Sequence, residues 1–148
     1  MIKLVIGADH QGEKVLKEIK KYLLSNEIEV LEIDEVNHPL DDYPDFAFKV
    51  CQKTLKNNCL GVLLCGSGIG MSIAANKIKG IRCARVSNED DAFTAKNHNG
   101  CNVIALSSQI NIDEIKQIID TFIVTKNPSE ERHLRRIEKI NKIESDGI

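Results

Sequence analysis

Short apolar runs and amphipathic segments alternate along this chain, and that alternation is the feature that most constrains its fold. The runs expected to form strands span residues 3–8, 28–33, 60–65, 81–86 and 102–106. Apolar residues at helical spacing predict helices over residues 15–24, 43–55, 69–77, 90–97, 112–124 and 129–144. Strands that alternate with helices of this length indicate βαβ units, with helices on both faces of a parallel sheet.

The length of 148 residues suits one hydrophobic core, and no repeat, linker or low-complexity segment divides the chain. We therefore expect residues 1–148 to form a single α/β domain. The predicted architecture is a three-layer αβα, Rossmann or flavodoxin-like fold: a five-stranded parallel sheet of order 2-1-3-4-5, with an extra C-terminal helix. Ligands of such sheets bind beyond the carboxyl ends of the strands, where the strand order reverses. That point lies between strands one and three, which end in Asp9-His10 and Cys65.

The loop after the third expected strand is rich in glycine. The residues that follow Cys65 are Gly66, Ser67, Gly68, Ile69 and Gly70. Glycines let the backbone turn so that its N–H groups can face an anion. A dinucleotide loop would need a third glycine where Met71 stands, so the loop better suits one oxyanion that forms during a reaction. The alternative is a plain turn after a buried cysteine, although three glycines in five residues exceed what a turn needs.

Cys65 is the candidate nucleophile or base, because a thiolate beside this loop could attack a carbonyl or remove a proton from carbon. The cysteines are five in number, irregularly spaced and without a C-x-x-C pair. This pattern predicts reduced thiols in a cytoplasmic protein, without disulfides or a zinc site. Buried, chemically inert thiols are expected at Cys51, Cys59, Cys83 and Cys101.

Several polar residues at the ends of elements allow two interpretations. Asp9 could serve a site or cap the next helix, and His10 could contact phosphate or act in acid–base chemistry. His98 could be catalytic or interact with the end of a helix. Arg132 and Arg136 share a helical face and could grip a phosphate together, or lie on a solvated face among nearby glutamates.

The net charge and the hydropathy of the chain limit the classes of partner that it is expected to bind. A formal charge of −2 disfavours nucleic acid as a partner. No apolar stretch approaches the ~20 residues of a membrane helix, and the N-terminal run is too short for a signal peptide. We expect neither a nucleic acid nor a membrane as partner.

The motifs follow one another in a fixed order: Gly7-Ala8-Asp9-His10, Asp42-Tyr43-Pro44, Cys65-Gly66-Ser67-Gly68-Ile69-Gly70, Ser72-Ile73-Ala74-Ala75-Asn76-Lys77, Gly80-Ile81-Arg82, His98-Asn99, Asn102-Val103 and Arg132-His133-x-x-Arg136. In this order the sequence resembles the type B ribose-5-phosphate isomerases, a family that also includes the galactose-6-phosphate isomerase subunits. The resemblance implies an aldose-ketose isomerase that interconverts ribose 5-phosphate and ribulose 5-phosphate through an enediolate, without metal or cofactor.

The same resemblance assigns roles. The implied catalytic residues are Cys65 (the base), His98 (ring opening), Asp9 and Ser67. The implied substrate-binding residues are His10, Tyr43, Gly66, Gly68, Ile69, Gly70, Asn99, Gln109, Arg132 and Arg136. Of these, His10 and the two arginines are expected to hold the phosphate. The family forms dimers, or dimers of dimers, whose active sites are shared between subunits, and we expect the same here.

Two positions refine this expectation. Family members with another base carry glycine at the thiol position and a glutamate in the loop; Cys65 and Met71 place this chain with the cysteine members. Gln109 stands where the family usually has an arginine of the phosphate site, so the preferred sugar is open. The alternatives are an isomerase of galactose or allose 6-phosphate, a galactose-6-phosphate isomerase subunit that needs a partner chain, and a non-catalytic sugar-phosphate-binding module.

Overall fold

A computed structural model describes residues 1–147. Its strands are β1 (Lys3–Ala8), β2 (Glu29–Glu32), β3 (Leu60–Cys65), β4 (Cys83–Arg85) and β5 (Val103–Ser107). Its helices are α1 (Glu13–Ser25), α2 (Tyr43–Asn57), α3 (Ile69–Ala75), α4 (Glu89–Asn97), α5 (Ile112–Val124) and α6 (Glu131–Asp146). Every expected element is confirmed, with ends that differ by a few residues.

All strands are parallel and form one sheet of order β2-β1-β3-β5-β4. The expected order was wrong in its last two strands. All five residues of β5 are buried, which suits an interior strand covered on both faces. By contrast, β4 has three residues and ends in the exposed Arg85, which suits an edge. The order still reverses between β1 and β3, where the site was expected.

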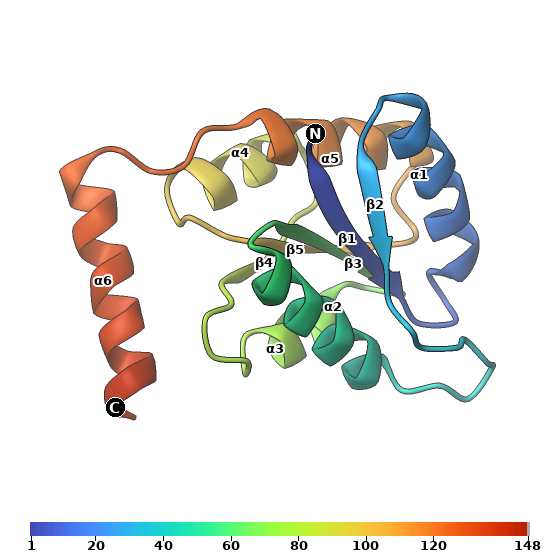
Figure 1. Ribbon diagram of the computed structural model, residues 1–148, viewed down its shortest axis with the longest axis horizontal. Helices are drawn as coiled ribbons and strands as arrows, with labels where there is room; N and C mark the ends of the chain where they lie inside the picture. The colour runs from blue at the N-terminus through green and yellow to red at the C-terminus, as the bar shows by residue number, and fades with distance from the viewer. Residues whose placement is uncertain (148) are drawn as a thin grey trace.

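Alternate strand residues face two helical layers, so the three-layer architecture is confirmed (Figure 1). Leu4 and Ile6 of β1 pack with buried residues of α1, α4 and α5 on one face. Val5 packs with buried residues of α2 and α3 on the other face. The strands are apolar on both sides because both of their faces are covered.

A side chain occupies the outer edge of β4. The carboxamide of Asn76 accepts a hydrogen bond from the Cys83 N–H (2.8 Å) and donates one to the Cys83 carbonyl (2.9 Å). These two bonds satisfy backbone groups of the edge strand that have no neighbouring strand to pair with.

Helix α6 extends beside the sheet and not over either face (Figure 1). Its buried residues are His133 and Ile137, and Glu144 accepts a hydrogen bond from the backbone N–H of Gly80 (3.1 Å). Leu134, Ile140 and Ile143 of the same helix are between 44% and 57% exposed. None of the helices within residues 1–147 is both long enough and apolar enough to cross a membrane.

Candidate active site

The carboxyl ends of β1 and β3 bring most of the predicted site together. The Asp9 N–H donates to the Leu64 carbonyl (3.3 Å), which joins the two strand ends. A β-carbon on Gly66 would lie 2.0 Å from the Gln11 side chain, and one on Gly70 would lie 2.6 Å from the Tyr43 ring. The missing side chains at Gly66 and Gly70 therefore let Gln11 and Tyr43 lie against the loop. Gln11 was not predicted.

The thiol of Cys65 lies at the start of this loop and is 5% exposed. Its sulfur accepts a hydrogen bond from the Gly68 N–H (3.0 Å). Gly68 has a φ of 78°, a left-handed conformation that favours glycine. A donor directed at sulfur stabilises a thiolate more than a thiol, because hydrogen bonds to charged acceptors are stronger.

The loop is fixed from its other side by residues of β4 and β5. The Ser67 carbonyl accepts a hydrogen bond from Arg85 Nε (2.8 Å), and the Gly66 carbonyl accepts one from the Ser107 hydroxyl (2.7 Å). Ser107 Oγ in turn accepts the Gln109 N–H (3.1 Å), so Gln109 belongs to this neighbourhood. The Ser67 hydroxyl accepts the Ile69 N–H (3.2 Å).

The other four cysteines lack this environment. Burial raises the pKa of Cys51 to about 12 and that of Cys101 to about 11. Burial also raises the pKa of Cys59 and of Cys83. Thiols that resist ionisation are poor nucleophiles and bases, in agreement with the inert role expected for them.

Asp9 holds the turn that leads into α1 and does not cap the helix itself, because the N-cap residue of α1 is Gly12, which has no side-chain cap. Its Oδ1 accepts the backbone N–H groups of Gln11 (3.0 Å) and Gly12 (3.3 Å). Burial raises the pKa of Asp9, against the effect of these two hydrogen bonds. Both bonds use Oδ1, so Oδ2 is the oxygen that can serve a ligand.

His10 is held by Asp41, a residue of the loop before α2. One carboxylate oxygen of Asp41 contacts His10 Nδ1 (2.6 Å) and accepts the His10 backbone N–H (3.1 Å). The hydrogen bond with Asp41 raises the pKa of His10. Burial opposes ionisation of Asp41, yet its hydrogen bonds with His10, Asn37 and His38 lower its pKa to about 2.

Asp9, His10 and Asp41 each offer one ligand atom, and these atoms lie within 4.8 Å of one another. The His10 nitrogen and the Asp41 oxygen already bond each other, and Asp9 Oδ1 accepts two amides. These bonds make the cluster a hydrogen-bonded network that orients His10, with its ligand atoms already engaged.

A second set of predicted residues lies where α4 ends and α6 begins. The His98 ring stacks on His133, with centroids 4.3 Å apart, and the Phe93 ring meets His98 edge-on at 6.0 Å. His133 is buried with no partner for Nε2 among the described residues, and burial lowers its pKa. The Arg132 guanidinium pairs with Glu130 (3.0 Å). Asn99 accepts a hydrogen bond from Arg82 at its carbonyl (3.0 Å).

The predicted site thus falls into two groups. The cysteine group comprises Asp9, His10, Tyr43, residues 65–70 and Gln109. The histidine group comprises His98, Asn99, Arg132 and Arg136. Within residues 1–147 no hydrogen bond or ion pair joins a residue of one group to a residue of the other.

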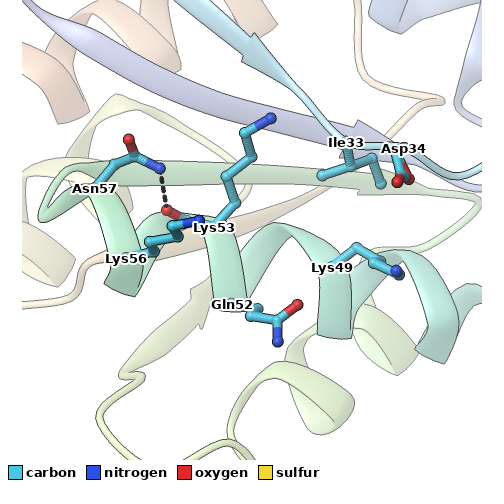
Figure 2. Close-up of a pocket in the computed structure, with 7 residues that line it drawn as sticks. All are labelled: Ile33, Asp34, Lys49, Gln52, Lys53, Lys56 and Asn57. Atoms are coloured by element: carbon cyan, nitrogen blue, oxygen red, sulfur yellow. Dashed lines mark hydrogen bonds between the residues drawn. The ribbon is translucent and has the colours of Figure 1, made fainter.

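A hollow of about 530 Å³ lies elsewhere, between the end of β2 and the outer side of α2. Figure 2 shows the side chains that line it, among them Lys49, Lys53 and Lys56. The side chains of Lys49 and Lys53 point in different directions, and Lys53 Nζ donates to the Glu32 carbonyl (2.5 Å). The lysines do not converge on one point, and none of the predicted site residues lines this hollow.

Comparison with known proteins gives one consistent result. The sequence profile of the Ribose/Galactose Isomerase family matches residues 4–140. A probable ribose-5-phosphate isomerase B of Mycoplasma genitalium is 39% identical over 150 residues, which cover 97% of this chain and 96% of that protein.

Solved structures agree. The ribose-5-phosphate isomerase B of Clostridium thermocellum superposes with a TM-score of 0.92 at 35% identity, over 99% of this chain and all of that one. The Mycoplasma genitalium enzyme with bound ribulose-5-phosphate gives a TM-score of 0.90 at 38% identity, over 97% of each chain.

Proposed function

The chain belongs to the ribose/galactose isomerase family, and from this we propose that it interconverts D-ribose 5-phosphate and D-ribulose 5-phosphate, as in the non-oxidative branch of the pentose phosphate pathway. The observation that carries this proposal is the position of Cys65. Its sulfur lies at the carboxyl end of a central strand and accepts the Gly68 N–H at 3.0 Å. A relative whose structure holds ribulose-5-phosphate supports the choice of sugar.

In the proposed reaction the Cys65 thiolate removes the proton from C2 of the ring-opened aldose. The electron pair moves into the C1–C2 bond and the C1 carbonyl oxygen takes the negative charge, which gives the enediolate. The proton on O2 then moves to O1 as the C2 carbonyl forms, and the thiol returns its proton to C1. Backbone donors and the Ser67 hydroxyl of residues 66–70 stabilise the negative charge.

The remaining residues bind and prepare the sugar. His98, assisted by Asp9, moves the proton that opens the furanose ring. His10, Arg132 and Arg136 hold the phosphate with charge-assisted hydrogen bonds, and Tyr43 and Asn99 line the sugar site. A fixed phosphate places C1 and C2 over the sulfur, which replaces a bimolecular encounter with a unimolecular step.

We further propose a homodimer, or a dimer of dimers, whose sites are shared between subunits. The cysteine group of one chain would then meet the histidine group of another. Two observations support this arrangement: no hydrogen bond or ion pair joins the two groups among residues 1–147, and the half-exposed apolar side chains of α6 leave a surface that a second chain could cover.

The Cys65→Ala variant tests the reaction. Turnover of ribose 5-phosphate should fall by roughly 10²–10⁴, the usual contribution of a general base, while the fold is retained. Cys59→Ala is the matched control, because Cys59 lies outside both groups and burial raises its pKa. Wild-type turnover by Cys65→Ala would remove the thiol from the mechanism.

The sugar preference needs a separate assay of the wild-type protein alone on ribose 5-phosphate, allose 6-phosphate and galactose 6-phosphate. We expect ribose 5-phosphate to give the highest kcat/KM. A higher kcat/KM for a hexose phosphate would identify the protein as an isomerase of galactose or allose 6-phosphate. The uncharged Gln109 leaves this alternative open. Binding without turnover of any of the three would instead favour a sugar-phosphate-binding module.

A further inference from the structure

The peptide group between Ser67 and Gly68 is hydrogen-bonded at both ends. Its carbonyl oxygen, on Ser67, accepts a hydrogen bond from Arg85 Nε at 2.8 Å. Its N–H, on Gly68, donates to Cys65 Sγ at 3.0 Å. One amide therefore connects the Arg85 guanidinium to the sulfur.

The backbone holds both ends of this connection in place. Arg85 ends β4 opposite Ala105 of β5, and the next residue, Val86, donates its N–H to the Ala105 carbonyl (3.0 Å). Gly68 lies against β5, since a β-carbon there would come 3.0 Å from the backbone of Leu106. The backbone of Arg85 and the loop are thus both held by β5.

Charged residues lie on both sides of the strand end that holds the sulfur. Arg85 approaches from β4, while Asp9 and His10 follow β1, where the Asp9 backbone bonds the residue before Cys65. Asp9 is a buried carboxyl, and burial raises its pKa. Arg85 is the cation that reaches the loop from the opposite side, through the Ser67 carbonyl.

We propose that Arg85 is a positioning residue for the Cys65 base: its guanidinium orients and polarises the Ser67–Gly68 peptide so that the Gly68 N–H stabilises the thiolate. Hydrogen bonds in a chain polarise one another, and a charged donor at one end strengthens the bond at the other. This inference rests on the proposed isomerase function, because it names what prepares the base of that reaction.

The test measures the sulfur directly. Wild type, Arg85→Gln, Arg85→Leu and Arg85→Lys are alkylated with iodoacetamide at a series of pH values, and modification of the Cys65 peptide is followed by mass spectrometry. In Arg85→Gln and Arg85→Leu we expect the pH midpoint of alkylation to rise by about half a unit, which slows modification about threefold below the midpoint. Arg85→Lys keeps the charge but loses the planar guanidinium group. Its alkylation midpoint should therefore lie between that of wild type and those of Arg85→Gln and Arg85→Leu.

Steady-state kinetics separate a positioning role from substrate contact. Arg85→Gln should lower kcat about threefold near neutral pH with little change in KM, because the substrate is not touched. Arg135→Gln is the matched control: it removes an exposed arginine that pairs with Glu131 (2.8 Å), and it should leave the alkylation profile unchanged.

Two results would overturn the inference. One is an alkylation profile that stays the same in both Arg85→Gln and Arg85→Leu. The other is a raised KM with an unchanged profile, which would place Arg85 against the substrate. Alkylation requires no turnover, so a wild-type protein without isomerase activity would reject the proposed function while the effect of Arg85 on the sulfur is still measured.

Discussion

At the scale of single residues, the His10–Asp41 pair is the contact whose effect on the site is easiest to measure. Asp41 presents one oxygen to both the backbone and the ring of His10, and its other oxygen accepts Asn37 and the His38 N–H. The ring therefore has a fixed direction, and the hydrogen bond with Asp41 raises its pKa, which favours the protonated form.

We expect Asp41→Asn to lower the pKa of His10 toward the ordinary value, which NMR titration of the ring protons measures. KM for ribose 5-phosphate near neutral pH should rise roughly 3- to 10-fold, because a charged donor to the phosphate is lost for part of the population. Asp34→Asn, in the same loop, is the matched control. An unchanged His10 titration in Asp41→Asn would contradict the assignment.

The same pair sets the sign of a pH effect on stability. The pKa of His10 is raised in the folded protein, so its contribution is full below the unfolded pKa of about 6.5 and is lost as pH rises through the folded value. The pKa of Asp41 is lowered to about 2, so its contribution is present above about 3.8 and disappears as pH falls toward 2. The free energy of unfolding in urea should therefore differ most between wild type and Asp41→Asn at pH values from about 3.8 to about 6.5, where both contributions are present.

The sequence was enough to predict site residues that are neighbours within a motif. It did not predict site residues that only the fold brings close to those motifs. Cys65, the loop glycines and Asp9-His10 could be located because strand ends of a parallel sheet meet at one edge. Asp41 and Arg85 could not, because each acts through a side-chain contact with a residue 31 or 18 positions away. Gln11 was missed for the same reason, since only the fold brings it against Gly66.

At the scale of elements, the period of the apolar residues was enough to locate every strand and helix, but not to order the last two strands. Both orders keep the reversal between β1 and β3, so the site prediction did not depend on the error. The arginines at 82 and 85 within the fourth expected strand favoured an edge position, and the apolar run before Ser107 favoured the interior.

Helices α1 and α5 are tied together by the Tyr22 hydroxyl, which donates to Asp120. This bond, ahead of burial, raises the pKa of Tyr22 to about 12. We expect Tyr22→Phe to lower the free energy of unfolding by about 1 kcal/mol at neutral pH, the typical net value of one hydrogen bond. The raised pKa means that the contribution is complete below about 10 and is lost as pH rises through about 12.

Denaturant unfolding of wild type and Tyr22→Phe at pH 7 and above pH 10 measures this difference. Asp120→Asn provides the second arm of a double-mutant cycle, in which the two single changes should not add because they remove the same bond. Additive losses would show that Tyr22 and Asp120 stabilise the helices independently.

At the scale of the whole molecule, the separation of the cysteine group from the histidine group leads to a complementation test. Cys65→Ala and His98→Asn should each be inactive alone. If sites are shared in a dimer, random exchange of the two chains makes heterodimers with one intact site, and about a quarter of wild-type activity should return.

The control for this test is each variant mixed with itself, which should stay inactive. Sites built within one chain would give no recovery in the mixture, because every chain then carries a defect. The two variants can carry different tags, so that the formation of mixed dimers is measured. A lack of recovered activity counts as evidence only in samples that contain mixed dimers.

The amide of Asn76 has a further consequence for the behaviour of the protein at high concentration. By occupying the free N–H and carbonyl of Cys83, it ends the hydrogen-bond ladder where another molecule could otherwise have added a strand. A single side chain thus blocks the addition of a strand from another molecule at the β4 edge of the sheet, and with it polymerisation through that edge.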